Sequence, residues 1–305
     1  MCNRVSHVQL FTHSPPTPLQ VAVVTRLWLT TFNSFEAHDE EGSLERLSRA
    51  VEDRAPGQAL ITVANHSTVL DDPALMAAVL PWRLVLNSAK HRWAVCTQEV
   101  CFRNDLFAAF VGCGKVLPIK RGAGVDQPQF LDLCRHVAAG NWVHLFPEGK
   151  VNQGDRIGAN YIGVRDAEAA ALCGGRLKWG IGKMVAHSPQ APVLIPFYAK
   201  GMRELLPCDP ATGENERPTL ARMTGKRVEF WAGREVKFDD LIRAHEIEHG
   251  PLWKYGSRPG EDSADWREHW PSSKEERALY SAITWRVEEE MIRLQSLDTE
   301  ASTSE

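Results

Sequence analysis

His66 and Asp71 form a candidate catalytic pair in a short polar stretch near the first quarter of the 305-residue chain. The apolar, β-branched run at residues 59–64 predicts a buried strand. Asp72 and Pro73 predict a helix start, because Asp caps free amides and Pro at the first helical position loses no needed donor. Across the turn between strand and helix, the carboxylate can fix the tautomer and orientation of the imidazole. This is the arrangement of a general base and its orienting partner.

The spacing of this pair alone is a weak signal. In a chain with 11 histidines, it arises by chance in roughly every second sequence of this length. The competing interpretation is structural: Asp72 caps the helix, and His66 is a half-buried residue of the turn. A second stretch favours chemistry, because residues 142–149 predict another buried strand that ends in Phe-Pro-Glu-Gly. That tetrapeptide is rarer by chance, on the order of a hundredfold.

Two further predicted strands frame these stretches. Residues 114–122 predict a strand that delivers Lys120 and Arg121 to a glycine-flanked turn, where a guanidinium could grip a phosphate. Residues 193–197 predict a strand that contains Pro196, which suits an edge position in a sheet. In an α/β sheet, ligands bind at the carboxyl ends of strands. The sequence therefore predicts one site built from several strand ends.

Taken in order, the blocks H-x4-D, Gly to Arg, Phe-Pro-Glu-Gly and Ile-Pro resemble the glycerolipid acyltransferase family over roughly residues 25–240. Acyl-CoA-dependent lysophosphatidate acyltransferases typically continue the third block with Thr-Arg. Here residues 150–152 are Lys-Val-Asn, which, with the blocks at 178–183 and 196–202, is similar to the branch that transfers acyl chains between phospholipids. Ser67 stands where that branch usually has Gln, and residues 153–173 and 250–273 look like insertions, so substrate preference stays open.

The resemblance implies a mechanism and a set of site residues. His66 would remove the proton from the free hydroxyl of a lysophospholipid, and Asp71 would stabilise the imidazolium. Arg121, with Lys120 and Lys150, would hold the headgroup phosphate, and Glu148 would orient either the glycerol hydroxyls or Arg121. The implied substrate-binding residues are Asn65, Lys120, Arg121, Phe146, Pro147, Glu148, Gly149 and Lys150. No cofactor and no metal are implied.

Further implications of the resemblance are cardiolipin remodelling and attachment to the mitochondrial membrane; it leaves the oligomeric state open. Two different functions also fit the sequence. One is an acyl-CoA-dependent lysophospholipid acyltransferase of the 1-acylglycerol-3-phosphate type, and the second is a non-catalytic membrane lipid-binding protein. Serine hydrolase chemistry is disfavoured, because the chain has no G-x-S-x-G elbow.

The composition is that of a globular protein, and its charge is unevenly distributed. The net charge is −4, yet residues 77–203 carry 16 basic and 8 acidic side chains, a balance of +8. This basic segment suits anionic lipid headgroups, although a solvated lysine-rich surface would have the same composition. Nucleic acid is not expected as a partner, because the overall charge is acidic and no nucleic-acid motif is present. The seven cysteines are irregularly spaced, which predicts neither a disulfide framework nor a zinc site.

Three regions are expected along the chain. Residues 1–35 contain no acidic side chain, and the apolar run at 18–32 is too short to span a bilayer comfortably. It predicts an interfacial helix, in which Trp28 and Phe32 lie at headgroup depth and Arg26 extends its charged end to water, or else a core helix. Residues 36–240 form the predicted acyltransferase domain, and residues 241–305 a C-terminal helical extension. A membrane surface is thus an expected partner.

Strands and helices alternate, which predicts an α/β sandwich with a largely parallel or mixed central sheet flanked by helices. The helices are expected at residues 36–54, 73–80, 98–111, 126–139, 177–187 and 274–297. The strands, besides those named above, are expected at residues 83–87 and 227–231. The last helix has an apolar stripe, which predicts that it docks on the domain. The stripe consists of Leu279, Ile283, Val287, Met291 and Leu294.

One motif points to a different chemistry. Residues 245–249 match H-E-x-x-H, in which two histidines share a helical face and bind zinc in metalloproteases. Gly250 and Pro251 end the helix at once, and the neighbouring residues are highly charged rather than apolar. A zinc site is therefore disfavoured.

Overall fold

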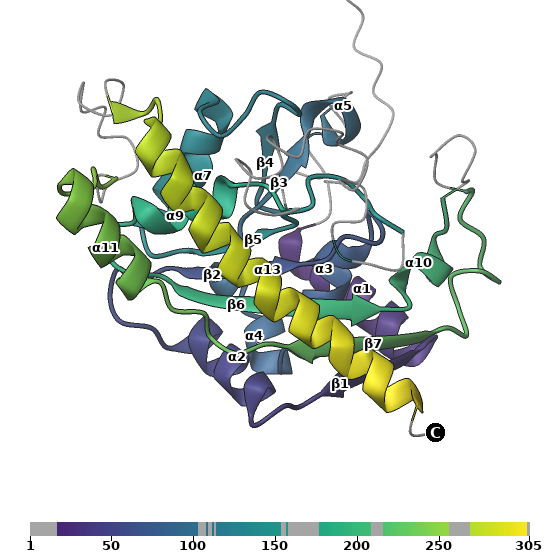
Figure 1. Ribbon diagram of the computed structural model, residues 1–305. Coiled ribbons are helices and arrows are strands. Elements are labelled where there is room, and N and C mark those ends of the chain that lie inside the picture. Colours follow the sequence, from purple (N-terminus) through teal and green to yellow (C-terminus); the bar gives the residue numbers. More distant parts are fainter. Residues whose placement is uncertain are drawn as a thin grey trace, which may run out of the picture.

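A mixed five-stranded sheet forms the centre of the fold (Figure 1). The computed structural model describes residues 17–102, 108, 112, 114–153, 157, 177–208, 216–255 and 269–303. The strand order is β1-β7-β6-β2-β5, and every neighbouring pair is parallel except β6 and β7. The strands are β1 (Ser34–His38), β2 (Leu60–Ala64), β5 (Trp142–Leu145), β6 (Val193–Lys200) and β7 (Arg227–Ala232). The predicted α/β architecture with a largely parallel or mixed sheet is confirmed.

A second, two-stranded parallel sheet continues the first beyond β5. It pairs β3 (Ala94–Thr97) with β4 (Val116–Ile119). Trp93, just before β3, bridges to Val143 in parallel, and its backbone makes two 2.7 Å hydrogen bonds with Trp142 and His144. The carboxyl ends of β2, β5, β3 and β4 therefore lie along one edge.

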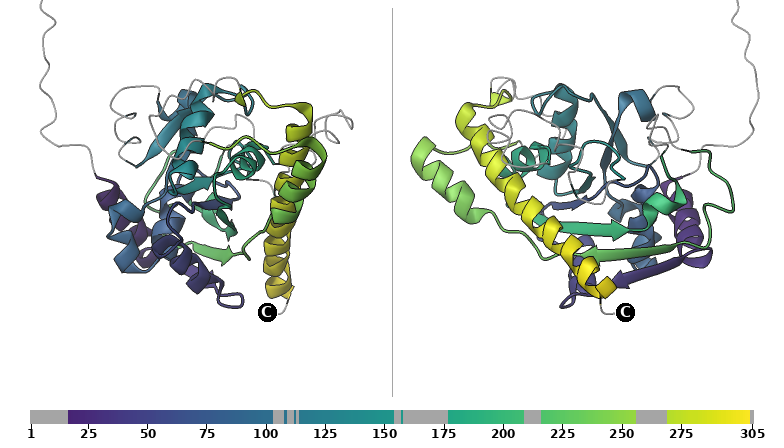
Figure 2. Two further views of the ribbon diagram at one scale, coloured as in Figure 1. Left: turned by 90° about the vertical axis from the view of Figure 1, so that its left-hand side faces the viewer. Right: turned by 45° about the vertical axis from the view of Figure 1, so that its right-hand side comes forward.

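The residues of β2 point alternately into two apolar cores, one on each face of the sheet. Leu60 and Ala64 lie in one core, and Ile61 and Val63 lie in the other. The five residues of the strand are all buried, as its unbroken apolar, β-branched sequence predicts for a central parallel strand. In the left view of Figure 2, helices cover both faces of this sheet.

The helices on the first face come from the first third of the chain. They are α1 (Pro18–Thr31), α2 (Ser43–Glu52), α3 (Asp71–Val79) and α4 (Trp82–Val85). α1 begins with a capping box, in which Thr17 and Gln20 bond each other's backbone amides, and it packs on α3. Arg26 donates to the carbonyls of Ala77, at 2.6 Å, and Leu80 at the end of α3. It thus binds the chain rather than extending to water, which corrects that part of the interfacial-helix prediction.

The second face is covered by α7 (Pro128–Ala138), α9 (Gly180–Ala186), α11 (Asp239–His249) and the long α13 (Lys274–Thr303). α13 lies across the sheet and contacts α9 and β6 (Figure 1). All five residues of its predicted apolar stripe are buried, so its predicted docking is confirmed. Two short helices complete the described elements, α5 (Gln98–Cys101) and α10 (Met202–Leu205), with a 3-10 turn at Ser88–Lys90.

Three local predictions were wrong. Residues 82–85 form α4 rather than a strand, and the helix predicted at 36–54 is β1 followed by α2. Pro196 lies in the central strand β6, between β7 and β2, rather than at an edge. The proline has no N–H to donate, and it is tolerated because the pairing of β6 with β7 begins only at the next residue, Phe197. The Pro196 carbonyl accepts from the backbone N–H of Gly233, just past the end of β7. Most of the helix predicted at 98–111 and of the insertions at 153–173 and 250–273 lies outside the described residues.

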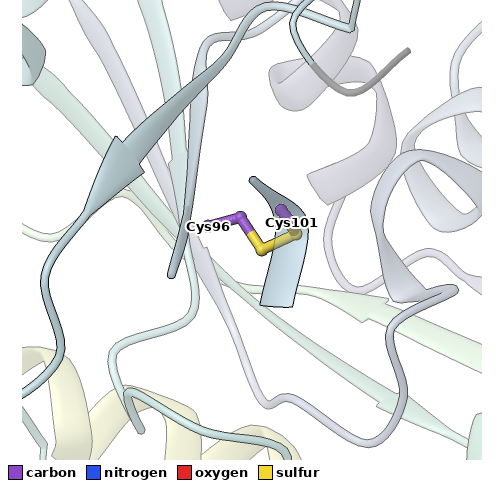
Figure 3. Close-up of a disulfide and its surroundings, with 2 residues drawn as sticks. All are labelled: Cys96 and Cys101. Carbon is purple, nitrogen blue, oxygen red and sulfur yellow. A yellow bond between two sulfur atoms is a disulfide. The ribbon is translucent and has the colours of Figure 1, made fainter. Parts of the chain in front are cut away.

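A disulfide joins Cys96, in β3, to Cys101 at the end of α5, with Cα atoms 6.0 Å apart (Figure 3). The irregular cysteine spacing predicts no disulfide, and on this pair that prediction was wrong. The five-residue separation closes into a bond because the chain turns from the strand directly into the short helix, which returns the second thiol to the first.

No helix in the described ranges is long and apolar enough to cross a membrane. The first and last predicted regions both join the central fold: β1, beginning at residue 34, pairs with β7, and α13 packs on β6. The division at residues 35 and 240 stays a prediction.

Candidate active site

The turn between β2 and α3 brings His66 and Asp71 together. The Nδ1 atom of His66 lies 3.0 Å from Oδ2 of Asp71. Because an ionised carboxylate only accepts hydrogen bonds, Nδ1 is the donor in this contact, and in the neutral imidazole Nε2 then presents a lone pair. Within the described ranges, Nε2 has no hydrogen-bond partner, and 18% of the His66 side chain is exposed. The imidazole is therefore oriented on one side and accessible on the other.

Asp71 is held in place by four donors. Its Oδ2 also accepts from the backbone amides of Ser67 (2.6 Å) and Thr68 (2.9 Å), and Oδ1 accepts from the Thr68 hydroxyl (3.1 Å). The carboxylate is buried, and these donors satisfy its oxygens inside the protein. The turn thus supplies a fixed negative charge that can stabilise a protonated His66.

One aromatic contact positions the His66 ring from the neighbouring strand, and a second supports the residue that makes it. Phe146, just past the end of β5, stacks on His66 with ring centroids 4.0 Å apart and an interplanar angle of 12°. His144 lies edge-on to Phe146 in turn, with ring centroids 4.8 Å apart. The Phe-Pro-Glu-Gly stretch therefore lies against the catalytic candidate, as its place at a strand end predicts.

Glu148 acts on His66 through the backbone. Its Oε1 accepts from the His66 amide at 2.9 Å, and its Oε2 accepts from the Asn152 side chain at 2.5 Å. The backbone N–H of Asn152 in turn donates to the His66 carbonyl at 2.6 Å. Glu148 is 1% exposed. It contacts the histidine turn, whereas the sequence predicts either the glycerol hydroxyls or Arg121 as its partner.

Asn65 and Pro147 are also engaged with the protein. The Asn65 amide group donates to the Ala199 carbonyl and accepts from the Ala199 amide, both at 2.8 Å, so it ties the turn to β6. Pro147 is buried, and its carbonyl accepts from the backbone N–H of Lys178 at 2.8 Å. Both residues therefore hold the walls of the site in place.

The three predicted phosphate-binding cations, Lys120, Arg121 and Lys150, are exposed, as is Gly149. Among the described residues, no hydrogen bond or ion pair joins the three side chains to His66 or Asp71. Arg121 follows β4 and His66 follows β2, so both lie at the same edge, three strand spacings or about 14 Å apart along it. Lys150 follows the Glu148 turn and is nearer in the fold. A ligand that touches both His66 and Arg121 must extend along this edge.

Two residues near the site carry no sequence signal of their own. Arg92 donates to Asp72 and to the Gly114 carbonyl, both at 2.6 Å, which ties the start of α3 to the residues before β4. His144 bonds Thr62 at 2.8 Å. Burial lowers the pKa of His144 to about 4, with smaller contributions from neighbouring charges, so this histidine is neutral. No local spacing marks either residue, because their partners are distant in sequence.

The H-E-x-x-H motif lies apart, on α11. His245 and His249 line a cavity of about 440 Å³ together with His269 from the segment before α13. The ring centroids of His245 and His249 are 4.8 Å apart. In the described part of the chain, the only three metal-ligating groups within 4.8 Å of one another are Glu36, His38 and Glu229, and Arg227 already pairs with both carboxylates.

Comparison with known proteins identifies similar chains. The sequence profile described as "Acyltransferase" matches residues 44–200, a range that contains every predicted site residue. The chain is 37% identical to tafazzin from Drosophila melanogaster over 65% of its own length and 46% of that protein. It is 33% identical to N-acylphosphatidylethanolamine synthase from Arabidopsis thaliana, over 64% of this chain and 62% of that one. A protein named taffazin from Dictyostelium discoideum is 26% identical over 88% of this chain and 82% of that one. The chain thus spans about half to two thirds of the first two relatives.

Proposed function

The chain belongs to the acyltransferase family, and we propose that it transfers a fatty acyl chain from a phospholipid to a lysophospholipid without coenzyme A. The observation that carries the proposal is the His66–Asp71 pair, with Nδ1 bonded to the carboxylate and Nε2 free in the described structure. The pair lies within the matched range. Likeness to proteins named tafazzin supports the choice of phospholipid substrates.

The proposed reaction uses one base throughout. His66 Nε2 takes the proton of the free glycerol hydroxyl, and that oxygen attacks the ester carbonyl of the donor phospholipid. Asp71 stabilises the imidazolium that forms. The tetrahedral intermediate then collapses, and Nε2 returns the proton to the leaving glycerol oxygen. One ester bond forms and one breaks, so the exchange is nearly isoenergetic and needs no activated cofactor.

The headgroup is proposed to lie along the carboxyl edge of the strands. Arg121, Lys120 and Lys150 would hold its phosphate through charge-assisted hydrogen bonds, and they are exposed and available to do so. Phe146 and Gly149 would line the acceptor side next to His66. Asn65, Pro147 and Glu148 act by positioning, since their polar atoms are bonded to the protein.

We also propose peripheral attachment to a membrane through α1. Val24, Leu27 and Phe32 of this helix and its C-cap are exposed, while Ala22 and Leu29 are buried against the core. Such a helix can lie in the interface with its apolar side chains among the lipids. The mitochondrial membrane and cardiolipin are proposed as the location and the lipid; this choice rests on likeness to tafazzins alone.

A second candidate function keeps the same base and changes the acceptor. The 33% identity to a protein named N-acylphosphatidylethanolamine synthase favours a lipid amine as the acceptor. His66 would then deprotonate an ammonium group, and the product would be an amide. An acyl-CoA donor, or lipid binding without catalysis, would be compatible with the same fold.

The experiment that tests the proposal is acyl transfer by the purified protein. Liposomes would contain phosphatidylcholine with isotope-labelled acyl chains, together with lysophosphatidylethanolamine and monolysocardiolipin, and would be assayed by mass spectrometry with and without CoA. We expect label to appear as new esters in the lysophospholipids without CoA. Strict dependence on acyl-CoA would overturn the transacylase proposal, amide products would favour the second candidate, and no transfer under any condition would favour lipid binding alone.

A further inference from the structure

Lys183, on α9, is a buried cation that the site described above does not use. Its side chain is 1% exposed. The ammonium donates to Asp126 Oδ1 at 2.6 Å, to the Trp270 carbonyl at 2.6 Å and to the Ser272 hydroxyl at 3.0 Å. An ammonium has three protons, so its capacity is used in full. It also lies 3.8 Å from the centre of the Trp270 ring.

The other end of this network is the loop that follows β4. Besides Lys183, Asp126 accepts from Ser272 at 2.6 Å and from Arg277 at 2.8 Å, and its carbonyl accepts from the Trp270 indole at 2.5 Å. Asp126 is thus fixed by α9, by the segment before α13 and by the first turn of α13. Two regions that are distant in sequence from this loop, α9 and residues 270–277, therefore meet on Asp126.

The loop that Asp126 ends is the one that carries Lys120 and Arg121. Within it, the Lys120 amide donates to the Gln127 side chain at 2.8 Å, and Gln127 donates to the Gly124 carbonyl at 2.8 Å. Gly122 and Gly124 have φ values of 78° and 76°, which other residues rarely adopt. The loop is therefore braced internally at Gln127 and anchored externally at Asp126.

A buried lysine is a costly way to fill space. Removing an ammonium from water is unfavourable unless it is paired and hydrogen-bonded, and an apolar residue of similar volume would often be as stable or more so. Burial raises the pKa of Asp126, but the hydrogen bonds of Lys183 and Ser272 and the nearby positive charges outweigh it, so the net effect lowers the pKa. Burial lowers the pKa of Lys183, although its hydrogen bond to Asp126 opposes that shift. The geometry of the pair holds one specific loop.

We propose that Lys183 is a positioning residue for headgroup binding: acting through Asp126, it holds the loop of residues 120–127 so that Lys120 and Arg121 meet a lipid phosphate. This rests on the proposed function for the identity of the ligand. It also links the start of α13 to the headgroup loop, because Arg277 and Ser272 bind the same carboxylate.

The test uses the full chain and the variants Lys183→Met, Asp126→Asn and the double variant. The first readout is calorimetric binding of dihexanoylphosphatidylglycerol, a soluble lipid with one phosphate, which does not require turnover. The second is KM and kcat for the lysophospholipid in the transfer assay, and the third is amide hydrogen exchange across residues 120–127. Val51→Ala, in the core on the opposite face, is the matched control for loss of stability alone.

We expect Lys183→Met to raise Kd and KM tenfold or more, to leave kcat within threefold and to speed exchange at residues 120–127. The Kd of the double variant should be no larger than that of the single variant that binds the lipid less tightly, because Lys183 and Asp126 act through one contact. Val51→Ala should lower Tm without changing Kd. Should Lys183→Met fail to fold, Asp126→Asn carries the same expectations.

Unchanged Kd and unchanged exchange at residues 120–127 would overturn the proposal and leave Lys183 a structural residue. A Kd change without faster exchange in this loop would overturn the route through Asp126. If the wild type binds the lipid but transfers no acyl chain, the proposed function fails while this proposal stands. If wild type and variants both fail to bind the lipid, the headgroup role is rejected.

Discussion

At the scale of single residues, the site depends on backbone bonds around His66 as much as on its side chain. Both its amide and its carbonyl are bonded to the Phe-Pro-Glu-Gly strand end, the first by Glu148 and the second by Asn152. Asp71 and Phe146 then fix the ring. The histidine is thereby preorganised, so little of its motion has to be frozen when substrate binds.

Changing Glu148 to Gln should misplace this histidine. Gln keeps one acceptor oxygen and places an NH2 group where the second oxygen was, so one of the two donors that Glu148 binds, the His66 N–H or the Asn152 side chain, would face another donor. We expect the free energy of unfolding to fall by about 1–3 kcal/mol, since a buried donor loses its partner. The transfer rate should fall roughly a hundredfold, because small errors in position are costly in catalysis. Urea unfolding and the liposome assay measure the two effects.

Glu235→Gln is the matched control for this variant, because Glu235 pairs at the surface with Lys237. Its stability should stay within about 0.5 kcal/mol and its rate should not change. A Glu148→Gln protein with the activity of the wild type would show that the backbone of His66 needs no such support.

How far the sequence predicts these residues depends on the range of their contacts. His66 and Asp71 could be paired from sequence because a single turn joins them. The bonds of Glu148 to His66 and of Arg92 to Asp72 span 82 and 20 residues, and nothing local indicates them. Asn152 belongs to a block that carries the family resemblance, yet its bond to the His66 carbonyl forms only when β2 and β5 are adjacent.

At the scale of elements, α9 and α13 approach each other unusually closely. A Cβ added at Gly182 would lie 2.3 Å from the Tyr280 carbonyl oxygen and 2.4 Å from its Cα, both backbone atoms that cannot move aside. The two helices can therefore pack at this distance only with glycine here. Beside the contact, His187 of the α9 C-cap bonds the Tyr280 hydroxyl.

Gly182→Ala should separate the two helices. We expect a loss of about 2–3 kcal/mol in the free energy of unfolding, as overpacking against backbone requires the helices to shift. Gly180→Ala on the same helix is the control, because its Cβ would meet only the end of the Phe130 ring, at 2.9 Å, and the end of a side chain can shift more easily than backbone. Equal stability of the two variants, measured by chemical denaturation, would contradict the close packing of α9 on α13.

Elements were predicted well where a period or a buried run was long. The stripe of α13 and the central strands were predicted correctly, since apolar periodicity reports burial directly. One short element was predicted wrongly: the four residues at 82–85 form a helix although their apolar content suits a strand. The edge position predicted from Pro196 was wrong, because the position of a strand in the sheet depends on where its partner strands begin. The local sequence does not contain that information.

At the scale of the whole molecule, the sheet separates two surfaces that are covered by different helices. α1 covers one face and exposes Val24 (64%), Leu27 (46%) and Phe32 (58%). The Trp28 indole of α1 donates to the Met223 carbonyl at 2.8 Å. This bond joins α1 to the turn before β7, which also carries the exposed Leu220. α11 and α13 cover the other face (Figure 2).

Serine at Val24, Leu27 and Phe32 together should weaken attachment to membranes. These side chains are exposed, so we expect stability within about 0.5 kcal/mol of the wild type and liposome binding roughly tenfold weaker or more, because apolar burial in lipid is lost. Co-sedimentation with cardiolipin-containing liposomes measures binding. Serine at Ile247 and Trp285, which are exposed on α11 and α13, should not change it. If both variants bind alike, α1 is not the attachment surface.

His66 is the proposed base for acyl transfer. Its role is tested by the rate of CoA-free transfer by His66→Ala at equal amounts of liposome-bound protein, with His249→Ala at the end of α11 as the matched histidine control. We expect a loss of roughly a thousandfold for His66→Ala. Liposome binding should be unchanged, and so should the rate of His249→Ala. A His66→Ala protein that transfers acyl chains within tenfold of the wild-type rate would show that another group acts as the base.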